Sequence, residues 1–119
     1  MRYLCLIYED EKWWDKATPA DMEKGMADYN AFTENIKKNG NYIGGEALQP
    51  TKTATSVTVR NGKVSTTDGP YVETKEQLGG YYLIKAKDLN DAIQVAAKIP
   101  PSRIGSIEVR PIMEFNAQP

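Results

Sequence analysis

A segment near the N-terminus, residues 2–8, is apolar on both of the faces that a β-strand would present. Side chains alternate across a strand, and both sets here are apolar or aromatic: Tyr3, Cys5 and Ile7 on one side, Leu4, Leu6 and Tyr8 on the other. Residues 80–86 repeat this pattern, with Lys85 as their one charged side chain. A sheet built around such strands must be covered on both faces, and this requirement restricts the fold strongly.

Helix and strand patterns alternate along the rest of the chain. Thr18 followed by Pro19 predicts a helix start, because threonine caps the first amides and proline fits the first helical position. This helix is expected to end at Asn39 and Gly40, and a second one to begin at Asp88. Strand patterns occupy residues 2–8, 41–48, 56–60, 63–67, 80–86 and 106–114.

Two further local patterns lead to specific expectations. Asn61 and Gly62 favour a type I′ turn, which predicts a β-hairpin with Val59 opposite Val64. Apolar side chains at helical spacing predict one core-facing stripe on the first helix, made of Met22, Met26, Tyr29, Phe32 and Ile36.

Trp13 and Trp14 fall in the linker before the first helix, where they form a lid or anchor the loop.

The order of these elements is that of a split βαβ, ferredoxin-like fold of the α+β class, in a single domain over residues 1–119. Both helices of such a fold cover the same face of an antiparallel sheet. The other face would expose several large apolar side chains to water, and a patch of this kind usually marks an interface. We therefore expect a homodimer in which the two sheets face each other around a shared cavity.

Composition excludes several classes of function. With 15 basic and 16 acidic residues the net charge is −1, so the chain has no basic surface for direct nucleic-acid binding. The apolar start is too short to span a membrane and no export cleavage site follows it, so we expect a cytoplasmic protein. There is no histidine and only one cysteine, and we expect no metal and no cofactor. Acid or base chemistry would then depend on carboxylates, lysines or tyrosines.

The last strand supplies polar groups to the expected cavity. If its apolar side meets the helices, Glu108 and Arg110 face the cavity, where they hold a polar ligand or form a solvated or inter-subunit ion pair. Tyr8 and Tyr82 are predicted to line the same pocket. The alternative for each tyrosine is a core ring with one hydrogen-bonded hydroxyl group.

Asp68 is the candidate catalytic residue. It opens the run Asp68-Gly69-Pro70, whose residue types are those of a turn, and this structural role alone explains the aspartate. A catalytic role requires burial or a neighbouring charge that moves its pKa toward neutrality. Both interpretations of Asp68 remain open at this level.

Four segments resemble the DGPF family of the YCII-related superfamily. They are R-Y-L-C-L-I-Y at 2–8, G-G-E-A-L-Q-P at 44–50, T-D-G-P-Y-V-E-T-K-E-Q-L-G-G-Y-Y-L-I at 67–84 and G-S-I-E-V-R-P at 105–111, with Tyr71 in place of the usual phenylalanine. The resemblance implies a ferredoxin-like fold that dimerises into an α/β barrel. It implies no settled activity. A histidine and an aspartate suggest catalysis in the superfamily, and of these only the aspartate has a counterpart here, Asp68.

The functional hypothesis is therefore a dimeric protein that binds a small molecule between its subunits. In its enzymatic form, which the sequence leaves undecided, Asp68 transfers a proton while Tyr8, Tyr82, Glu108 and Arg110 hold the ligand. DGPF proteins are often encoded beside extracytoplasmic-function sigma factors, so the alternative is a non-catalytic module that binds a partner through residues 73–77. A third alternative is a purely architectural turn at Asp68.

Overall fold

The computed structural model describes residues 1–115, apart from the side chain of Arg103. Within this range the main sheet has four antiparallel strands in the order β2 (Tyr42–Ala47), β5 (Gln77–Lys85), β1 (Arg2–Glu9) and β6 (Ser106–Pro111). In chain order these are the second, third, first and fourth strands of the sheet, which is the ferredoxin-like arrangement. The predicted α+β fold is confirmed.

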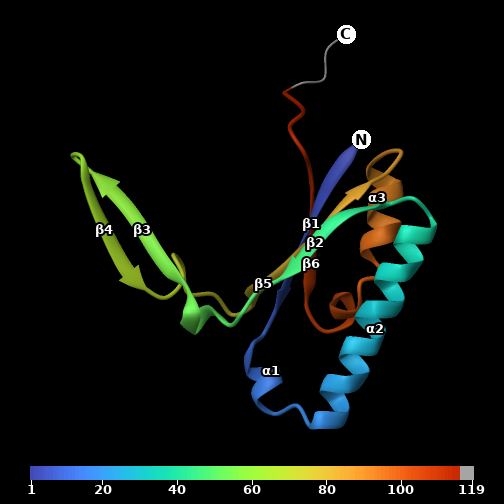
Figure 1. Ribbon diagram of the computed structural model, residues 1–119, viewed down its shortest axis with the longest axis horizontal. Helices are drawn as coiled ribbons and strands as arrows, with labels where there is room; N and C mark the ends of the chain where they lie inside the picture. Colours follow the sequence, from blue (N-terminus) through green and yellow to red (C-terminus); the bar gives the residue numbers. More distant parts are fainter. Residues whose placement is uncertain (116–119) are drawn as a thin grey trace.

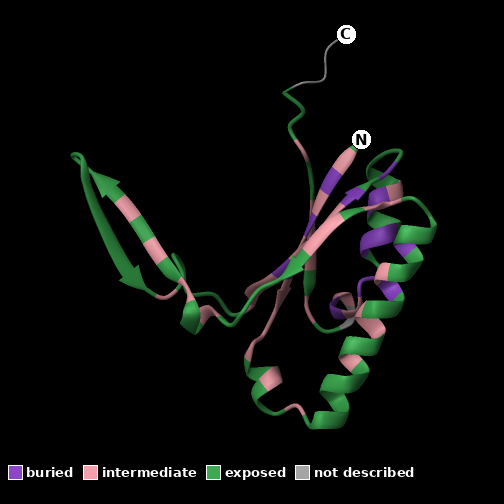
Figure 2. Cartoon of the chain, viewed as in Figure 1, coloured by how far each residue is buried: buried purple, intermediate pink, exposed green. Residues whose placement is uncertain are grey.

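Two helices, α2 (Pro19–Lys38) and α3 (Leu89–Ala96), lie on the same side of this sheet (Figure 1). The buried side chains fill the space between the helices and the sheet: Tyr3, Cys5, Ile7, Phe32, Ile36, Tyr82, Ile84, Ala86, Ala92, Val95, Ala96 and Ile99. The core therefore lies on one side of the sheet. As a result, buried and half-buried residues alternate along β1 and most of β5 (Figure 2).

The helix boundaries follow the capping signals. Thr18 accepts a hydrogen bond from the backbone of Asp21, whose carboxylate accepts one from the backbone of Thr18, and this reciprocal pair is a capping box. At the start of α3 the side chain of Asp88 accepts a hydrogen bond from the backbone N–H of Asp91 at 2.9 Å. Gly40 has a φ of 79° just after α2, as expected for the residue that ends a helix.

The core stripe predicted for the first helix is wrong at its N-terminal end. Met22 and Met26 are 50% and 66% exposed, whereas Phe32 and Ile36 are buried. At 20 residues α2 is about 30 Å long, and its first turns run past the end of the sheet (Figure 1). Leu89 and Ile93 of α3 are also exposed, at 50% and 46%.

Short helical segments complete the frame. Trp13 and Trp14 lie in a short helix, α1 (Lys12–Asp15), instead of the predicted linker. The ring of Trp14 packs against Gly25, where an added Cβ atom would lie 3.5 Å from it. Two 3-10 turns, η1 (Thr51–Thr53) and η2 (Pro100–Arg103), precede β3 and β6. No helix within residues 1–115 combines the length and apolar character needed to cross a lipid bilayer.

The predicted hairpin forms, but it does not join the main sheet. Strands β3 (Thr55–Arg60) and β4 (Lys63–Asp68) pair only with each other and project away from the sheet (Figure 1), and we call this pair the hairpin arm. Asn61 and Gly62 have φ values of 51° and 76°, as a type I′ turn requires. Val59 lies opposite Val64, as predicted.

Candidate functional site

The face of the main sheet turned away from the helices, called the open face below, combines apolar and polar side chains. Residues directly opposite each other in antiparallel strands share a face, so the pairing of Leu6 with Tyr81 and with Glu108 puts all three there. Leu4 likewise lies between Leu83 and Arg110. The open face is thus apolar in the middle of β1 and β5, with Arg2 and Lys85 paired at one end, and charged along β6.

Three of the predicted ligand-binding residues share this open face. Glu108 and Arg110 form a close ion pair along β6, with side chains that are 40% and 69% exposed. Tyr8 is half buried and lies opposite Ser106 of β6. A phenol, a carboxylate and a guanidinium therefore line one side of the open face, beside the leucines of β1.

Tyr82 does not join them, and its expected place in the same pocket is corrected. Its neighbour Tyr81 occupies the open face, so alternation turns Tyr82 toward the helices, where it is 8% exposed. Its hydroxyl group is hydrogen-bonded to Thr33 at 2.8 Å, and its ring meets Phe32 edge to face with centroids 5.1 Å apart. Burial raises the pKa of Tyr82. The geometry is that of a core tyrosine with a satisfied hydroxyl group.

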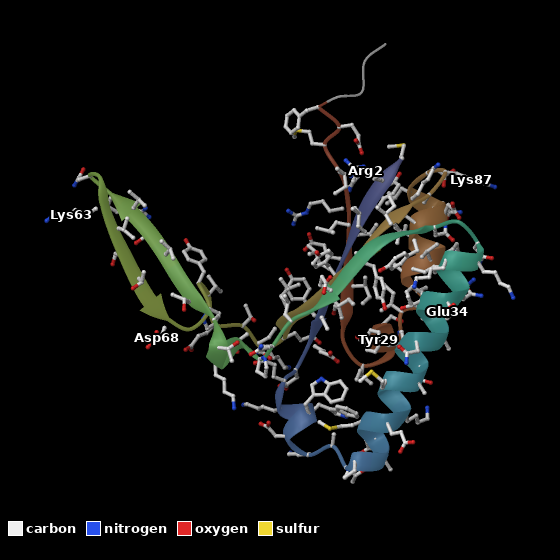
Figure 3. All side chains as sticks on the ribbon, viewed as in Figure 1. Arg2, Tyr29, Glu34, Lys63, Asp68 and Lys87 are labelled. Carbon is white, nitrogen blue, oxygen red and sulfur yellow. The ribbon has the colours of Figure 1, made fainter. Side chains whose placement is uncertain are left out.

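Asp68 lies apart from both groups. It is the last residue of β4, opposite Thr55, and is exposed at the foot of the hairpin arm (Figure 3). The chain turns immediately after it: Gly69 has a φ of 105° and its N–H donates to the carbonyl of Ala54 at 2.8 Å. Within one chain, Asp68 is therefore held as a turn residue and is not brought to the open face.

The structure also reveals a carboxylate that the sequence analysis missed. Glu9 continues the helix-side face of β1, is half buried and receives a side-chain hydrogen bond from Trp14. Burial raises its pKa, and Glu76 on the adjoining segment adds to the effect. Burial and the charge of Glu9 also raise the pKa of Tyr29, which α2 places nearby. The available signal was that Glu9 keeps the spacing of Tyr3, Cys5 and Ile7, although its charge suggested only the end of the strand.

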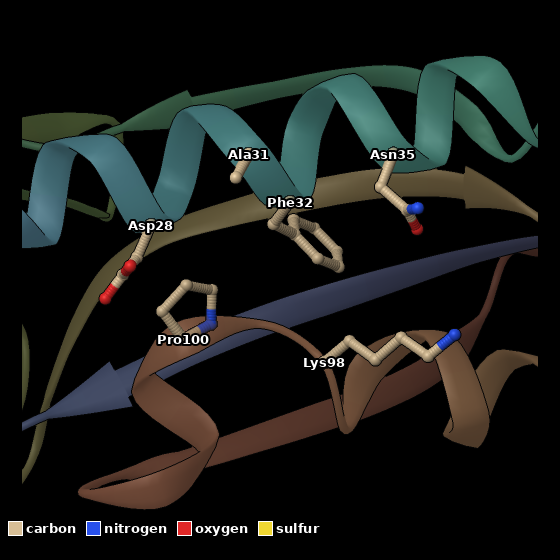
Figure 4. A pocket seen from close by; sticks show the side chains of 6 residues that line it. All are labelled: Asp28, Ala31, Phe32, Asn35, Lys98 and Pro100. Atoms are coloured by element: carbon tan, nitrogen blue, oxygen red, sulfur yellow. The ribbon is translucent and has the colours of Figure 1, made fainter.

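A shallow groove lies on the helical side, between α2 and the segment that follows α3 (Figure 4). Asp28, Ala31, Phe32 and Asn35 line it from α2, and Lys98 and Pro100 line it from the opposite wall. It contains none of the predicted site residues. Among residues 1–115, no three or more acidic or cysteine side chains are placed together to hold a metal ion.

The fold and the open face define a class: a small ferredoxin-like domain with helices on one side of the sheet and a mixed apolar and charged surface on the other. The model of the YCII-related domain matches residues 1–116, and the chain belongs to the YCII-related family. An uncharacterised protein of Rhizobium meliloti (strain 1021) is 33% identical over 114 residues, which cover 94% of this chain and 92% of that protein. The predicted membership of the superfamily is thus confirmed, and the DGPF subfamily remains an inference from the motif.

Proposed function

We propose that the chain works as a homodimer whose two open faces enclose a chamber for a small organic ligand. One observation carries the proposal: the leucines of β1 and β5 occupy the face that no helix covers, next to Tyr8, Glu108 and Arg110. Apolar walls with a few convergent polar groups are typical of ligand sites. A second copy placed on this face would supply the second wall.

The polar groups indicate the chemistry of the ligand. Arg110 offers a planar set of donors suited to a carboxylate or another oxyanion, and Glu108 orients it through the ion pair. Tyr8 adds a hydroxyl group that can donate to a carbonyl oxygen. A small compound with a carboxylate and a further oxygen function suits this combination.

An enzymatic form of this function would use Asp68 as the proton-transferring group. Asp68 lies on the hairpin arm, away from the open face of its own chain. The arrangement to test is therefore one in which Asp68 of one subunit acts at the open face of the other. General acid or base catalysis contributes about 10² to 10⁴ in rate, so Asp68→Asn should lower kcat by that factor. Unchanged turnover in Asp68→Asn would remove this residue from the chemistry and leave ligand binding intact.

Ligand binding is tested by thermal shift with a panel of small carboxylates, keto acids and hydroxy acids. A ligand present at 100 times its Kd stabilises the folded state by about 2.7 kcal/mol, which is readily measured. Arg110→Met should abolish the shift, whereas Arg60→Met, at the tip of the hairpin arm, should preserve it. A shift that persists in Arg110→Met would exclude the proposed anchor.

A second candidate function is binding of a protein partner, such as an extracytoplasmic-function sigma factor. The observation favouring it is the exposed segment after the hairpin arm, where Tyr71 and Val72 are 85% and 55% exposed. Calorimetry with a purified sigma factor of this class should then detect binding that survives Asp68→Asn and is lost in the double variant Glu73→Lys, Lys75→Glu. Equal binding by the charge-reversed chain would argue against this surface.

A further inference from the structure

In one copy of the chain the hairpin arm is exposed along all of β4 and along β3 except at Ser56 and Thr58, which are partly buried. Its strands form a sheet of their own, and an isolated two-stranded hairpin is only marginally stable in water. Such an element normally requires a third strand or an apolar surface to pack against. Its own main sheet does not provide a paired strand, because β3 and β4 bond only with each other.

One face of the arm carries three valines, whereas the other is polar throughout. Val59 and Val64 lie directly opposite each other, and Val57 lies two residues further along β3, so the three share a face. Val59 is 55% exposed, Val64 70% and Val57 59%. The other face carries Ser56, Thr58, Arg60, Lys63, Ser65 and Thr67. We call the first of these the valine face.

Asp68 belongs to the valine face as well. Asp68 lies four residues from Val64 along β4, so the two side chains share a face. Its partner Thr55 is likewise an even number of residues from Val57 and Val59 along β3. Whatever covers the three valines will therefore also approach the foot of the arm on the side of Asp68.

Hydrogen bonds join the segment before the arm to the rest of the domain. The carboxylate of Glu11 accepts hydrogen bonds from the backbone N–H of Thr51 at 2.8 Å and from its hydroxyl group at 2.6 Å. The backbone N–H of Leu48 donates to the carbonyl of Gly79 at 2.9 Å. Within the arm, the hydroxyl group of Ser56 donates to the carbonyl of Gly69 at 2.8 Å. These bonds fix the segment that leads into the arm, which lowers the entropic cost of placing the arm on a surface.

The chain exposes more surface than a compact chain of its length. The accessible surface is 8886 Å², whereas a compact monomer of 13.3 kDa exposes about 6,500 Å². The radius of gyration is 16.6 Å, against about 13 to 14 Å expected for a compact chain of this length. The excess is roughly 2,400 Å² per chain, or about 4,800 Å² for two chains, which is at the upper end of the total area that obligate homodimers bury.

The open face accounts for only part of this excess. Its four strands, spaced about 4.8 Å apart and averaging about 24 Å in length, cover a projected area of roughly 450 Å². The accessible area of a face is larger than its projection, but the excess of roughly 2,400 Å² is about five times this value. The hairpin arm, with three exposed valines, is a further exposed apolar surface on the described part of the chain.

We propose that the valine face of the hairpin arm packs against a second copy of this chain, and that Asp68 thereby enters the chamber of the partner subunit. This inference rests on the proposed homodimer and adds to it a residue of the site that one copy cannot provide. The contact buries three valines on each arm and converts the exposed Asp68 into an interface residue. Each chamber then contains the open face of one chain and Asp68 of the other.

The test compares neighbouring residues on opposite faces of the arm by sedimentation equilibrium. Val59→Lys buries a charge in the proposed contact and should raise the Kd of the dimer at least tenfold. Thr58→Lys, one residue away on the polar face, should change it less than threefold. Val57→Lys repeats the test at a second position, and circular dichroism verifies that each variant is folded.

A variant on the open face separates this inference from the proposed dimer. If Leu6→Lys dissociates the dimer but Val59→Lys and Val57→Lys do not, the arm lies outside the interface and the inference is overturned while the dimer stands. If Thr58→Lys weakens the dimer as much as Val59→Lys, the valine face is not the contact and the inference also fails. A wild-type chain that stays monomeric at micromolar concentration overturns both proposals.

Discussion

The hydrogen bond between Tyr82 and Thr33 gives a quantitative test of the face to which Tyr82 belongs. The two hydroxyl oxygens are 2.8 Å apart in the core between α2 and β5. A buried hydrogen bond of this kind contributes about 0.5 to 1.5 kcal/mol to stability, and leaving a buried hydroxyl group without a partner costs about 1 to 3 kcal/mol. Thr33→Val should therefore destabilise the chain at least as much as Tyr82→Phe.

The double variant should cost less than the sum of the two single changes, because removing both hydroxyl groups leaves neither one unsatisfied. The coupling free energy expected from the cycle is about 0.5 to 1.5 kcal/mol. For a chain of this size, 1 kcal/mol corresponds to a change in Tm of about 3 to 6 °C. Urea and thermal denaturation at one fixed protein concentration measure all four variants.

Tyr81→Phe is the matched control, because Tyr81 lies one residue away on the open face. It should leave the stability of the folded chain within about 0.5 kcal/mol of the wild type. Zero coupling between Thr33 and Tyr82 would refute the assignment of Tyr82 to the core. So would a Tyr82→Phe variant of unchanged stability that has lost ligand binding.

Three further predictions concern individual side chains. A Cβ atom on Gly45 would lie 2.8 Å from a backbone oxygen of β5, so Gly45→Ala should lose about 1 to 3 kcal/mol of stability by denaturant titration. Gly44→Ala meets no atom within 4 Å and should match the wild type, and equal losses would contradict the packing of β2. Burial raises the pKa of Cys5 to about 11, so at pH 8 a thiol reagent should label it only after unfolding; rapid labelling of the native chain would contradict its burial. The raised pKa of Glu9 means that the folded state binds its proton more tightly than the unfolded state, so the contribution of Glu9 to stability should be greatest below the ordinary pKa of 4.5 and fall as pH rises through the folded pKa. Glu9→Gln should remove this decline, giving a higher Tm than the wild type at pH 7 and a similar one at pH 4, and parallel pH profiles would refute it.

Local signals along the chain were enough to predict the architecture. Thr18 and Asp88 cap helices, and Asn61 with Gly62 forms the type I′ turn, because each of these effects depends on residues close in sequence. The order of elements then leaves few topologies for an antiparallel sheet with two helices. The alternation in β1 correctly separated the helix-side residues from those of the open face.

Features that depend on distant contacts were not predictable in the same way. The spacing of Met22 and Met26 fits a core stripe, but periodicity does not indicate where the sheet beneath a helix ends. Glu9 resembled a charge that ends a strand, and its burial depends on Trp14 and α2 folding over it. The residues proposed for ligand binding came from two faces of the sheet, and the register of β5 separates Tyr82 from the other three.

Strands β2 and β5 are neighbours in the main sheet, with Ala47 opposite Gly80, so a tight reverse turn would suffice to join them. The chain instead makes a long excursion through residues 48–76, and the arm is its tip. An excursion between two adjacent strands can be lengthened, shortened or replaced without changing the order of the strands or the residues of the core. Evolution and protein engineering therefore have a point of free variation here, at which pairing specificity between related chains can change while the underlying scaffold is preserved.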